Sequence, residues 1–419
     1  MRHRRPLGLR HVPADSGVPL ARLAGLEGFA RALMVGTVPL AALDALGSKQ
    51  AVSIVFMIGS ALTVFVTLNL ARIEQVLPRR WVVTVGIGAL IVAAALFAWG
   101  PAWAIPIAVG LRSAEASIFS VCLSLYMMDF IGKAELTKAE SRRSVWLAVT
   151  WVIGPMAGTW LWSAWWPDAP FVATIVAAVA LIAMHWWLRF LQNPVLRGPI
   201  VPAPSPIRSI PRFFGQPNLR IAYAVMCLRS IFWATVFVFG PIYVVEAGLP
   251  EWVAGAFLSV AASVLFMGPL VRRAADRWGV RFLVLRAFGL MGASMAVLFT
   301  LGEPRPLGIV FWLSGALGGG VIDVLGNIPF MRLVKPRERA AMTAVFSTWR
   351  EVSFLVAPAL AALVLAFAPF HVLYLVIALL MGIGVAVTTL LPRRLGQRPR
   401  ARQEARVDRL ADEGLVPAC

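Results

Sequence analysis

Apolar stretches long enough to cross a lipid bilayer recur along the whole chain, and short arginine-rich connectors separate them. A transmembrane helix needs about 20 predominantly apolar residues, and we count twelve such stretches between positions 29 and 391. Only 14% of the 419 residues are charged, whereas soluble domains average about 25%. The pattern predicts an all-α integral membrane protein for which lipid is the main solvent.

Basic residues in the connectors predict the orientation of these helices. Cytoplasmic loops of membrane proteins carry an excess of lysine and arginine. Nearly all of the 39 basic residues lie near the two ends of the chain, in alternate connectors or within the apolar stretches, whereas the other connectors hold Lys49 and Arg305. We therefore expect both termini in the cytoplasm and a multi-pass protein of the cell (inner) membrane.

A proline-rich segment divides the twelve stretches into two sets of six. Proline lacks an amide donor and clashes with the preceding turn, so this segment is not expected to be helical throughout. The two sets share weak similarity, because Arg31 and Thr37 have the same spacing as Arg229 and Thr235. We expect five regions: a cytoplasmic tail over 1–28, a six-helix bundle over 29–190, a cytoplasmic linker over 191–219, a second six-helix bundle over 220–391 and a basic cytoplasmic tail over 392–419.

The formal net charge of +19 does not indicate a nucleic-acid partner. The basic residues form short clusters between apolar runs, and no single domain or face collects them. The three cysteines lack metal-ligand spacing, and no zinc-protease, nucleophile-elbow or Walker pattern occurs. We expect no enzymatic activity, no metal and no cofactor. We also expect a monomer in the lipid bilayer. The absence of a Walker pattern leaves an ion gradient or facilitated diffusion as the energy source.

The connector after the eighth stretch carries the sharpest motif. It places Gly268 ahead of the run Asp276-Arg277-Trp-Gly279-Val-Arg281. This run resembles the loop signature of the major facilitator superfamily, whose fold has two six-helix bundles. The resemblance implies a gating loop in which Asp276 caps a helix or pairs with nearby arginines. An ordinary basic loop that obeys the charge rule is the alternative. The equivalent connector in the first half keeps little of the signature.

Two further motifs resemble the same superfamily. Arg112-Ser-Ala-Glu115 in the fourth stretch is similar to its Arg-x-x-Gln-Gly signature, whose arginine is implicated in proton transfer in the family's exporters. Gly154-Pro155-Met-Ala-Gly158 in the fifth stretch resembles the core of its antiporter motif and implies a drug/proton antiporter. A helix kink or a close-packing site is the alternative for the glycine–proline run.

Ionisable residues inside the apolar stretches mark a candidate pathway. Each costs about 2.5–3.5 kcal/mol at the centre of a bilayer, so such residues usually face a cavity or a partner. They concentrate in the first, fourth, seventh, tenth and eleventh stretches, and in the resembled family helices 1, 4, 7 and 10 line the central cavity. We expect the substrate and proton pathway to contain Arg31, Asp44, Arg112, Glu115, Arg229, Asp323, Asn327, Arg350 and Glu351.

Spacing and depth suggest how some of these charges pair. Asp323 and Arg350 lie at similar expected depths and are predicted to form a buried ion pair. Arg112 and Glu115 are three residues apart and share a helix face. Burial favours a neutral carboxyl group and a nearby arginine favours a charged one. Glu115 or Asp323 is therefore the expected carrier of a coupling proton. Static pairs that only hold helices together are the alternative, and Arg31 either joins the pathway or extends to the cytoplasmic surface.

The sequence therefore predicts a secondary transporter that exports a small molecule in exchange for protons. A symporter or uniporter for a polar metabolite is one alternative. A non-transporting relative that assists the assembly of a membrane complex is another, although such a scaffold has no need for charges on the helices that line the cavity. A membrane enzyme is disfavoured, because no cluster of reactive residues lies at a membrane face.

Overall fold

The computed structural model describes residues 17–131, 135–188, 206–334 and 338–392, and all regular structure in these ranges is helical. The first half contains α1 (Gly17–Leu33), α2 (Thr37–Leu46), α3 (Lys49–Val76), α4 (Arg79–Trp99), α5 (Ala104–Phe130), α6 (Leu136–Ala164) and α7 (Ala169–Trp187). The second half contains α8 (Pro206–Phe214), α9 (Pro217–Glu246), α10 (Glu251–Ser263), the 3₁₀ turn η3 (Val264–Met267), α11 (Gly268–Trp278), α12 (Val280–Leu301), α13 (Gly308–Leu325), α14 (Asn327–Leu333), α15 (Arg339–Phe346), α16 (Trp349–Phe367) and α17 (Phe370–Thr389).

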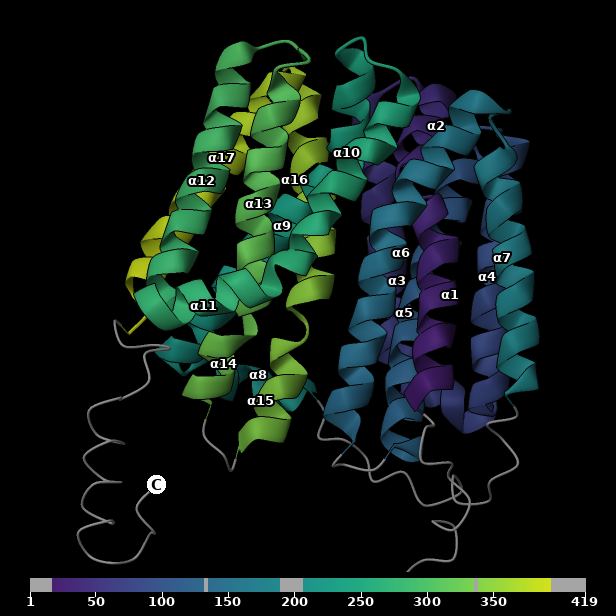
Figure 1. Cartoon of the computed structure of the whole chain (residues 1–419), viewed down its shortest axis with the longest axis horizontal. Helices are drawn as coiled ribbons and strands as arrows, with labels where there is room; N and C mark the ends of the chain where they lie inside the picture. The colour runs from purple at the N-terminus through teal and green to yellow at the C-terminus, as the bar shows by residue number, and fades with distance from the viewer. Residues whose placement is uncertain (1–16, 132–134, 189–205, 335–337, 393–419) are drawn as a thin grey trace, which may run out of the picture.

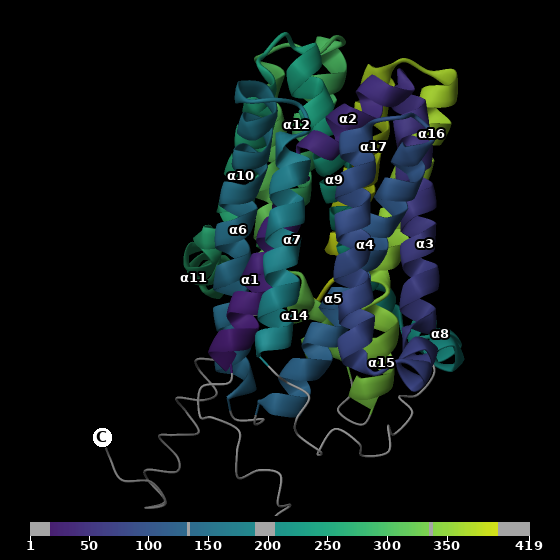
Figure 2. The same ribbon diagram turned by 90° about the vertical axis from the view of Figure 1, so that its right-hand side faces the viewer.

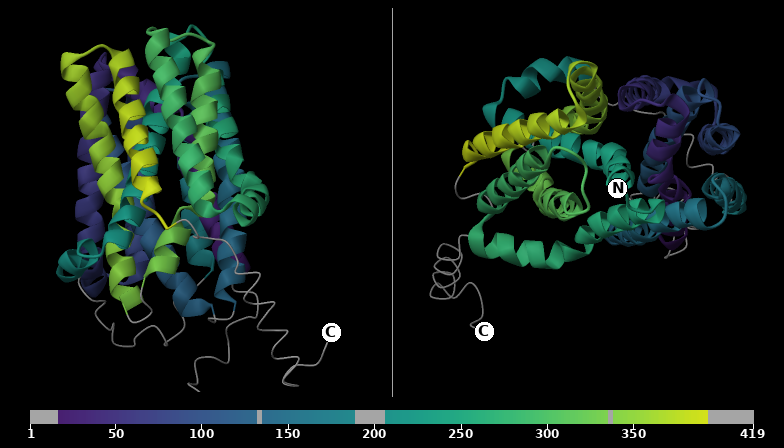
Figure 3. Two further views of the ribbon diagram at one scale, coloured as in Figure 1. Left: turned by 90° about the vertical axis from the view of Figure 1, so that its left-hand side faces the viewer. Right: turned by 90° about the horizontal axis from the view of Figure 1, so that it is seen from above.

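Twelve helical spans in the described ranges are long and apolar enough to cross a membrane, which confirms the predicted number. They form two bundles that stand side by side, with the first half in purple and blue and the second in green and yellow (Figure 1). The view from above separates the same two groups of helices (Figure 3). The all-helical fold with two bundles is therefore as the sequence predicts.

Large apolar side chains cover the outside of the bundles. Phe65, Val176, Leu363 and Phe367 are all more than half exposed. Soluble monomers rarely expose contiguous apolar surface on this scale. These side chains are stable where they are because the surrounding solvent is lipid, as the hydropathy of the sequence indicates.

The first span begins earlier than predicted. The apolar run begins at Phe29, whereas α1 begins at Gly17. The charges of Arg22 and Glu27 interrupt the hydrophobic pattern. The predicted start of the span therefore lies later in the chain than the observed start. Arg22 is exposed, but Glu27 is only 5% exposed and lies within the span. The earlier start therefore adds a buried carboxylate that the sequence analysis assigned to the tail over 1–28.

Several spans are interrupted in the structure. The first is divided between α1 and α2, the eighth between α10 and α11, and the tenth between α13 and α14, and a fourth interruption separates α15 from α16, which forms the eleventh span. Gly36, Gly268 and Gly326 lie at three of these interruptions. Charged residues lie close to three of them, because Arg31 precedes the first, Asp323 precedes the third and Arg350 follows the fourth.

The described part of the predicted linker contains the short helix α8. It lies at the inner ends of the spans beside α15 (Figure 2). Phe213 packs with Tyr223 and Phe346 in a small hydrophobic cluster. Arg212 pairs with Glu338, which ties α8 to the residue preceding α15. Residues 189–205 and the tail over 393–419 lie outside the described residues.

Candidate functional site

Deep in the first bundle, an arginine and a carboxylate on α1 form an ion pair. The Nε atom of Arg31 lies 3.0 Å from an Oε atom of Glu27, one helical turn earlier. With a rise of 1.5 Å per residue, Arg31 lies about 21 Å from the inner end of α1. Arg31 therefore does not extend to the cytoplasmic surface.

Glu115 on α5 is the most isolated carboxylate near this pair. Its residue is fully buried, and neither carboxylate oxygen has a hydrogen-bond partner among the described residues. Arg112, Arg31 and Glu27 lie within electrostatic range of it. The described ranges show no ion pair between Arg112 and Glu115, although the two residues share a helix face as predicted.

The second bundle contains a direct ion pair between two helices. Arg229 of α9 pairs with Asp323 of α13, and both side chains are largely buried. The predicted pairing of Asp323 with Arg350 is wrong, because the Asp323 carboxylate pairs with Arg229 instead. The direction in which each side chain points depends on packing between helices.

Trp349 and Arg350 begin α16 next to the Arg229–Asp323 pair. The guanidinium carbon of Arg229 lies 4.7 Å from the centroid of the Trp349 ring, and that of Arg350 lies 5.4 Å from it. Arg350 also lies within electrostatic range of Arg31 in the other bundle. We refer to Glu27, Arg31, Arg112, Glu115, Arg229, Asp323, Trp349, Arg350 and Glu351 as the central cluster.

Aromatic side chains connect the two bundles beside the central cluster. The rings of Trp151 on α6 and Phe237 on α9 lie 5.5 Å apart between centroids. Trp233 stacks on Phe237 at 5.4 Å, and the Arg31 guanidinium lies 6.0 Å from the Trp151 ring. The central cluster is thus bordered by an aromatic wall, which we define as Trp151, Trp233 and Phe237.

The predicted motif on α6 lies where this helix crosses α1 and α10. A Cβ atom on Gly154 would collide with Ala32, and one on Gly158 would collide with the backbone of Leu33. Glycine at these two positions therefore lets α1 and α6 approach closely. The close-packing interpretation of the motif has direct structural support.

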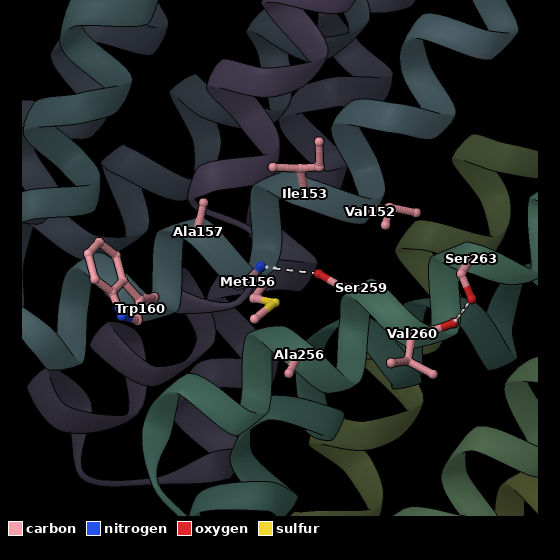
Figure 4. A pocket seen from close by; sticks show the side chains of 9 residues that line it. All are labelled: Val152, Ile153, Met156, Ala157, Trp160, Ala256, Ser259, Val260 and Ser263. Atoms are coloured by element: carbon pink, nitrogen blue, oxygen red, sulfur yellow. Dashed lines mark hydrogen bonds between the residues drawn. The ribbon is translucent and has the colours of Figure 1, made fainter.

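The same part of α6 bonds to the second bundle. The Met156 amide, which follows Pro155, donates a hydrogen bond of 3.2 Å to Ser259 of α10 (Figure 4). Thr159 donates to the carbonyl of Trp252 at 3.3 Å. Around these bonds, apolar residues of α6 and α10 line a shallow groove of about 630 Å³.

An ion pair joins the two bundles at their outer ends. Lys49, at the start of α3, lies 2.5 Å from Glu246 at the end of α9. Its ammonium group also lies 4.2 Å from the centroid of the Phe370 ring at the start of α17. Together with the bonds between α6 and α10, this outer latch, defined as Lys49, Glu246 and Phe370, holds the outer halves of the bundles together.

Most of the predicted gating loop is helical. Gly268, Asp276 and Arg277 belong to α11, and Gly279 forms the turn into α12 with a φ of +88°. A positive φ favours glycine, which explains its place in the motif. The side chains of Asp276 and Arg281 make no ion pair within the described ranges, so the predicted pairing of Asp276 with arginines is absent in this conformation.

Two predicted pathway residues have no hydrogen bond or ion pair with the central cluster in the part of the chain that the structure describes. They are Asp44 near the end of α2 and Asn327 at the start of α14, and both are exposed. Glu351 lies within electrostatic range of Arg350 and remains with the cluster. Sequence reasoning missed Glu27, although its spacing of four residues from Arg31 is the signal for a helical ion pair.

Comparison with known proteins identifies the family. A model of the Major Facilitator Superfamily matches residues 21–309 and 262–413. The chain belongs to the Major Facilitator Superfamily. This membership confirms the resemblance drawn from the motifs. It also agrees with a multi-pass membrane protein from a family of transporters rather than enzymes.

Individual relatives of this superfamily member are distant. The staphylopine export protein of Staphylococcus aureus (strain Mu50 / ATCC 700699) is 24% identical over 211 residues, which are 48% of this chain and 51% of that protein. The matched segment thus spans about half the length of this curated relative.

Solved structures of other transporters share the fold. A mutant of the nucleoside transporter NupG has a TM-score of 0.74 at 12% identity and covers 90% of this chain and 99% of its own. A bacterial homologue of the iron transporter ferroportin, in an inward-facing state, has a TM-score of 0.65 at 17% identity and covers 89% of this chain and 97% of its own. At these identities the likeness shows the fold alone.

Proposed function

We propose that this protein is a secondary transporter that exports a small molecule by alternating access and couples export to inward movement of protons. Membership of the superfamily and two bundles around a central cluster of charges support transport. The partial match to an export protein supports the direction. The resemblance of the α6 motif to the antiporter signature supports exchange with protons.

The burial of Glu115 without a hydrogen-bond partner in the described ranges is the observation that supports proton coupling. A buried carboxylate without a hydrogen bond or a direct ion pair is costly to ionise. Protonation removes that cost, and an arginine that approaches restores the charged form. Because Asp323 already pairs with Arg229, we assign the coupling proton to Glu115 in preference to Asp323.

Arg31 is the proposed partner that exchanges with the proton. It pairs with Glu27 here and lies within electrostatic range of Glu115. In the second bundle the equivalent arginine, Arg229, pairs with a carboxylate on the fourth helix of its bundle, and Glu115 is on the fourth helix of the first. We propose that Arg31 alternates between Glu27 and Glu115 as the bundles move, so that Glu115 is protonated in one state and ion-paired in the other.

Proteoliposomes that contain a pH-sensitive dye test this proposal. A panel of amphipathic molecules is screened for proton release that depends on an imposed pH gradient. In Glu115→Gln we expect gradient-driven accumulation of any substrate to disappear while exchange at equal pH persists, because only coupling needs the titrating carboxylate. Glu303→Gln, an exposed loop position, serves as the matched control and should behave like the wild type.

Two outcomes would contradict the proposal in different ways. If Glu115→Gln kept full gradient-driven accumulation, Glu115 would not carry the coupling proton. If no solute moved under any gradient in the wild-type protein, a role in the assembly of a membrane complex would be favoured over transport.

A further inference from the structure

Arginines outnumber their direct carboxylate partners where the two bundles meet. Arg31 pairs with Glu27, and Arg229 pairs with Asp323. Arg350, the second residue of α16, is exposed, and it makes no hydrogen bond and no ion pair among the residues that the structure describes. Glu351, the next residue, is within electrostatic range of Arg350 without pairing to it.

Three other arginines near Arg350 each have a carboxylate partner. Arg31, Arg143 and Arg229 lie within its electrostatic range and pair with Glu27, Glu140 and Asp323 respectively. Arg350 is the member of this group that lacks a direct partner in the described ranges. Arg350 lies at the start of the eleventh candidate span, Trp349–Phe367, about 16 Å along the helices from the start of α15. An unpaired guanidinium among three others is a site that a small anion would stabilise.

Aromatic side chains lie near this positive site. The guanidinium groups of Arg229 and Arg350 lie 4.7 Å and 5.4 Å from the centroid of the Trp349 ring. The aromatic wall of Trp151, Trp233 and Phe237 lies beside Arg31. The indole nitrogen of Trp233 is buried and has no hydrogen-bond partner in the described ranges.

The helix α16 begins at this site. Its first residues are Trp349, Arg350 and Glu351, and Thr348 before them gives no side-chain cap. The free amides at a helix N-terminus attract anions, and discontinuous membrane helices use them in this way. The Nε atom of Arg229 is also buried without a hydrogen-bond partner in the described part of the chain. The first turn of α16 already holds the Glu351 carboxylate, so the unused donor of Arg229 is the feature that favours a negatively charged ligand here.

We propose that Arg350, with Arg229 and Trp349, binds the carboxylate of an amphipathic organic anion whose planar apolar part packs against the aromatic wall. One unpaired guanidinium matches a single negative charge, which favours a monocarboxylate over a dianion such as a phosphate monoester. A cation is disfavoured at this position, because the positive charges of Arg350 and Arg229 repel it. This inference rests on the proposed transport function and names the substrate class of that site.

Three probes with one ring system and different charges test the substrate class. Indole-3-acetate is an anion, indole-3-acetamide is neutral, and tryptamine is a cation. Binding to the purified full-length protein is measured by isothermal titration calorimetry at pH 7. We expect the acid to bind at least about tenfold more tightly than the amide or the amine, since a charge-assisted hydrogen bond is about twice as strong as a neutral one.

Variants show whether Arg350 is responsible. Arg350→Gln should weaken binding of the acid about tenfold and leave the amide unchanged. Arg350→Lys should recover part of the loss, because it restores the charge without the planar fork. Arg286→Gln removes an arginine that also lies beside an aromatic ring, 5.1 Å from Phe282, but on α12 away from the cluster. It should bind like the wild type.

The results separate this inference from the proposed function. Equal binding of all three probes, tighter binding of tryptamine, no binding at all, or full affinity in Arg350→Gln would overturn the anion site. If tryptamine were moved by the proton gradient in proteoliposomes while the acid was not, transport would stand and the anion site would fail. If the acid bound as expected but no probe moved, the anion site would stand and the transport proposal would fail.

Discussion

Arg229 and Asp323 form a direct ion pair between two helices, so removing one charge leaves the other without its partner. In Asp323→Asn the Arg229 charge stays largely buried without its carboxylate. We expect the free energy of unfolding to fall by about 1–3 kcal/mol, because a buried donor loses its partner. Thermal unfolding of the purified protein in detergent measures this. The double variant Arg229→Gln/Asp323→Asn should recover much of the loss, and wild-type stability in Asp323→Asn alone would show that the pair contributes nothing.

At the scale of elements, the crossing of α1 and α6 depends on the absence of side chains at two glycines. Gly158→Ala places a methyl group against the backbone of Leu33, which cannot yield as a flexible side chain would. We expect a lower yield of folded protein and a melting temperature lower by several degrees, because overpacking costs about 1–3 kcal/mol. Size-exclusion chromatography after heating checks both.

Gly88→Ala provides the control for this glycine prediction. Gly88 lies inside α4, and a Cβ atom there meets nothing within 4 Å. Alanine is favoured over glycine in helices by about 1 kcal/mol, so this variant should be as stable as the wild type or slightly more stable. Equal tolerance of alanine at both glycines would mean that α1 and α6 can separate freely.

For the whole molecule, the outer latch should bias the equilibrium between conformations. The charge reversal Lys49→Glu replaces an attraction with a repulsion next to Glu246. An exposed pair is worth about 0.2–1 kcal/mol, so we expect the conformation closed at the outer side to lose population about twofold to fivefold. Lys49→Arg keeps the charge and should preserve the population.

Labelling of Cys227 measures this shift. Cys227 is half-buried on α9, with its sulfur 3.9 Å from the carbonyl oxygen of Trp349. In a background without Cys122 and Cys419, an impermeant maleimide applied from the cytoplasmic side should label it more slowly in Lys49→Glu than in the wild type. Unchanged labelling would exclude a role for the latch in setting the conformation.

The sequence alone determined the solvent, the number of spans and the family, and it predicts the orientation. Hydropathy and arginine placement are properties of local segments and need no knowledge of packing, so they can be read without a structure. Reasoning from local segments was wrong at the start of α1, where the charged residue Glu27 is buried within the span. It identified most charged residues of the central cluster, because ionisable residues are rare inside membrane spans.

The tertiary structure decided which residues meet. Asp323 pairs with Arg229 rather than Arg350, and within the described ranges Glu115 has no direct partner and the exposed residues Asp44 and Asn327 have no bond to the cluster. Depth follows from the residue number, since each helical residue rises by about 1.5 Å. Orientation around the helix axis and the distance between helices follow from packing, which close contacts such as that of Gly158 with α1 determine. Partners on different helices therefore depend on the folded arrangement of both bundles.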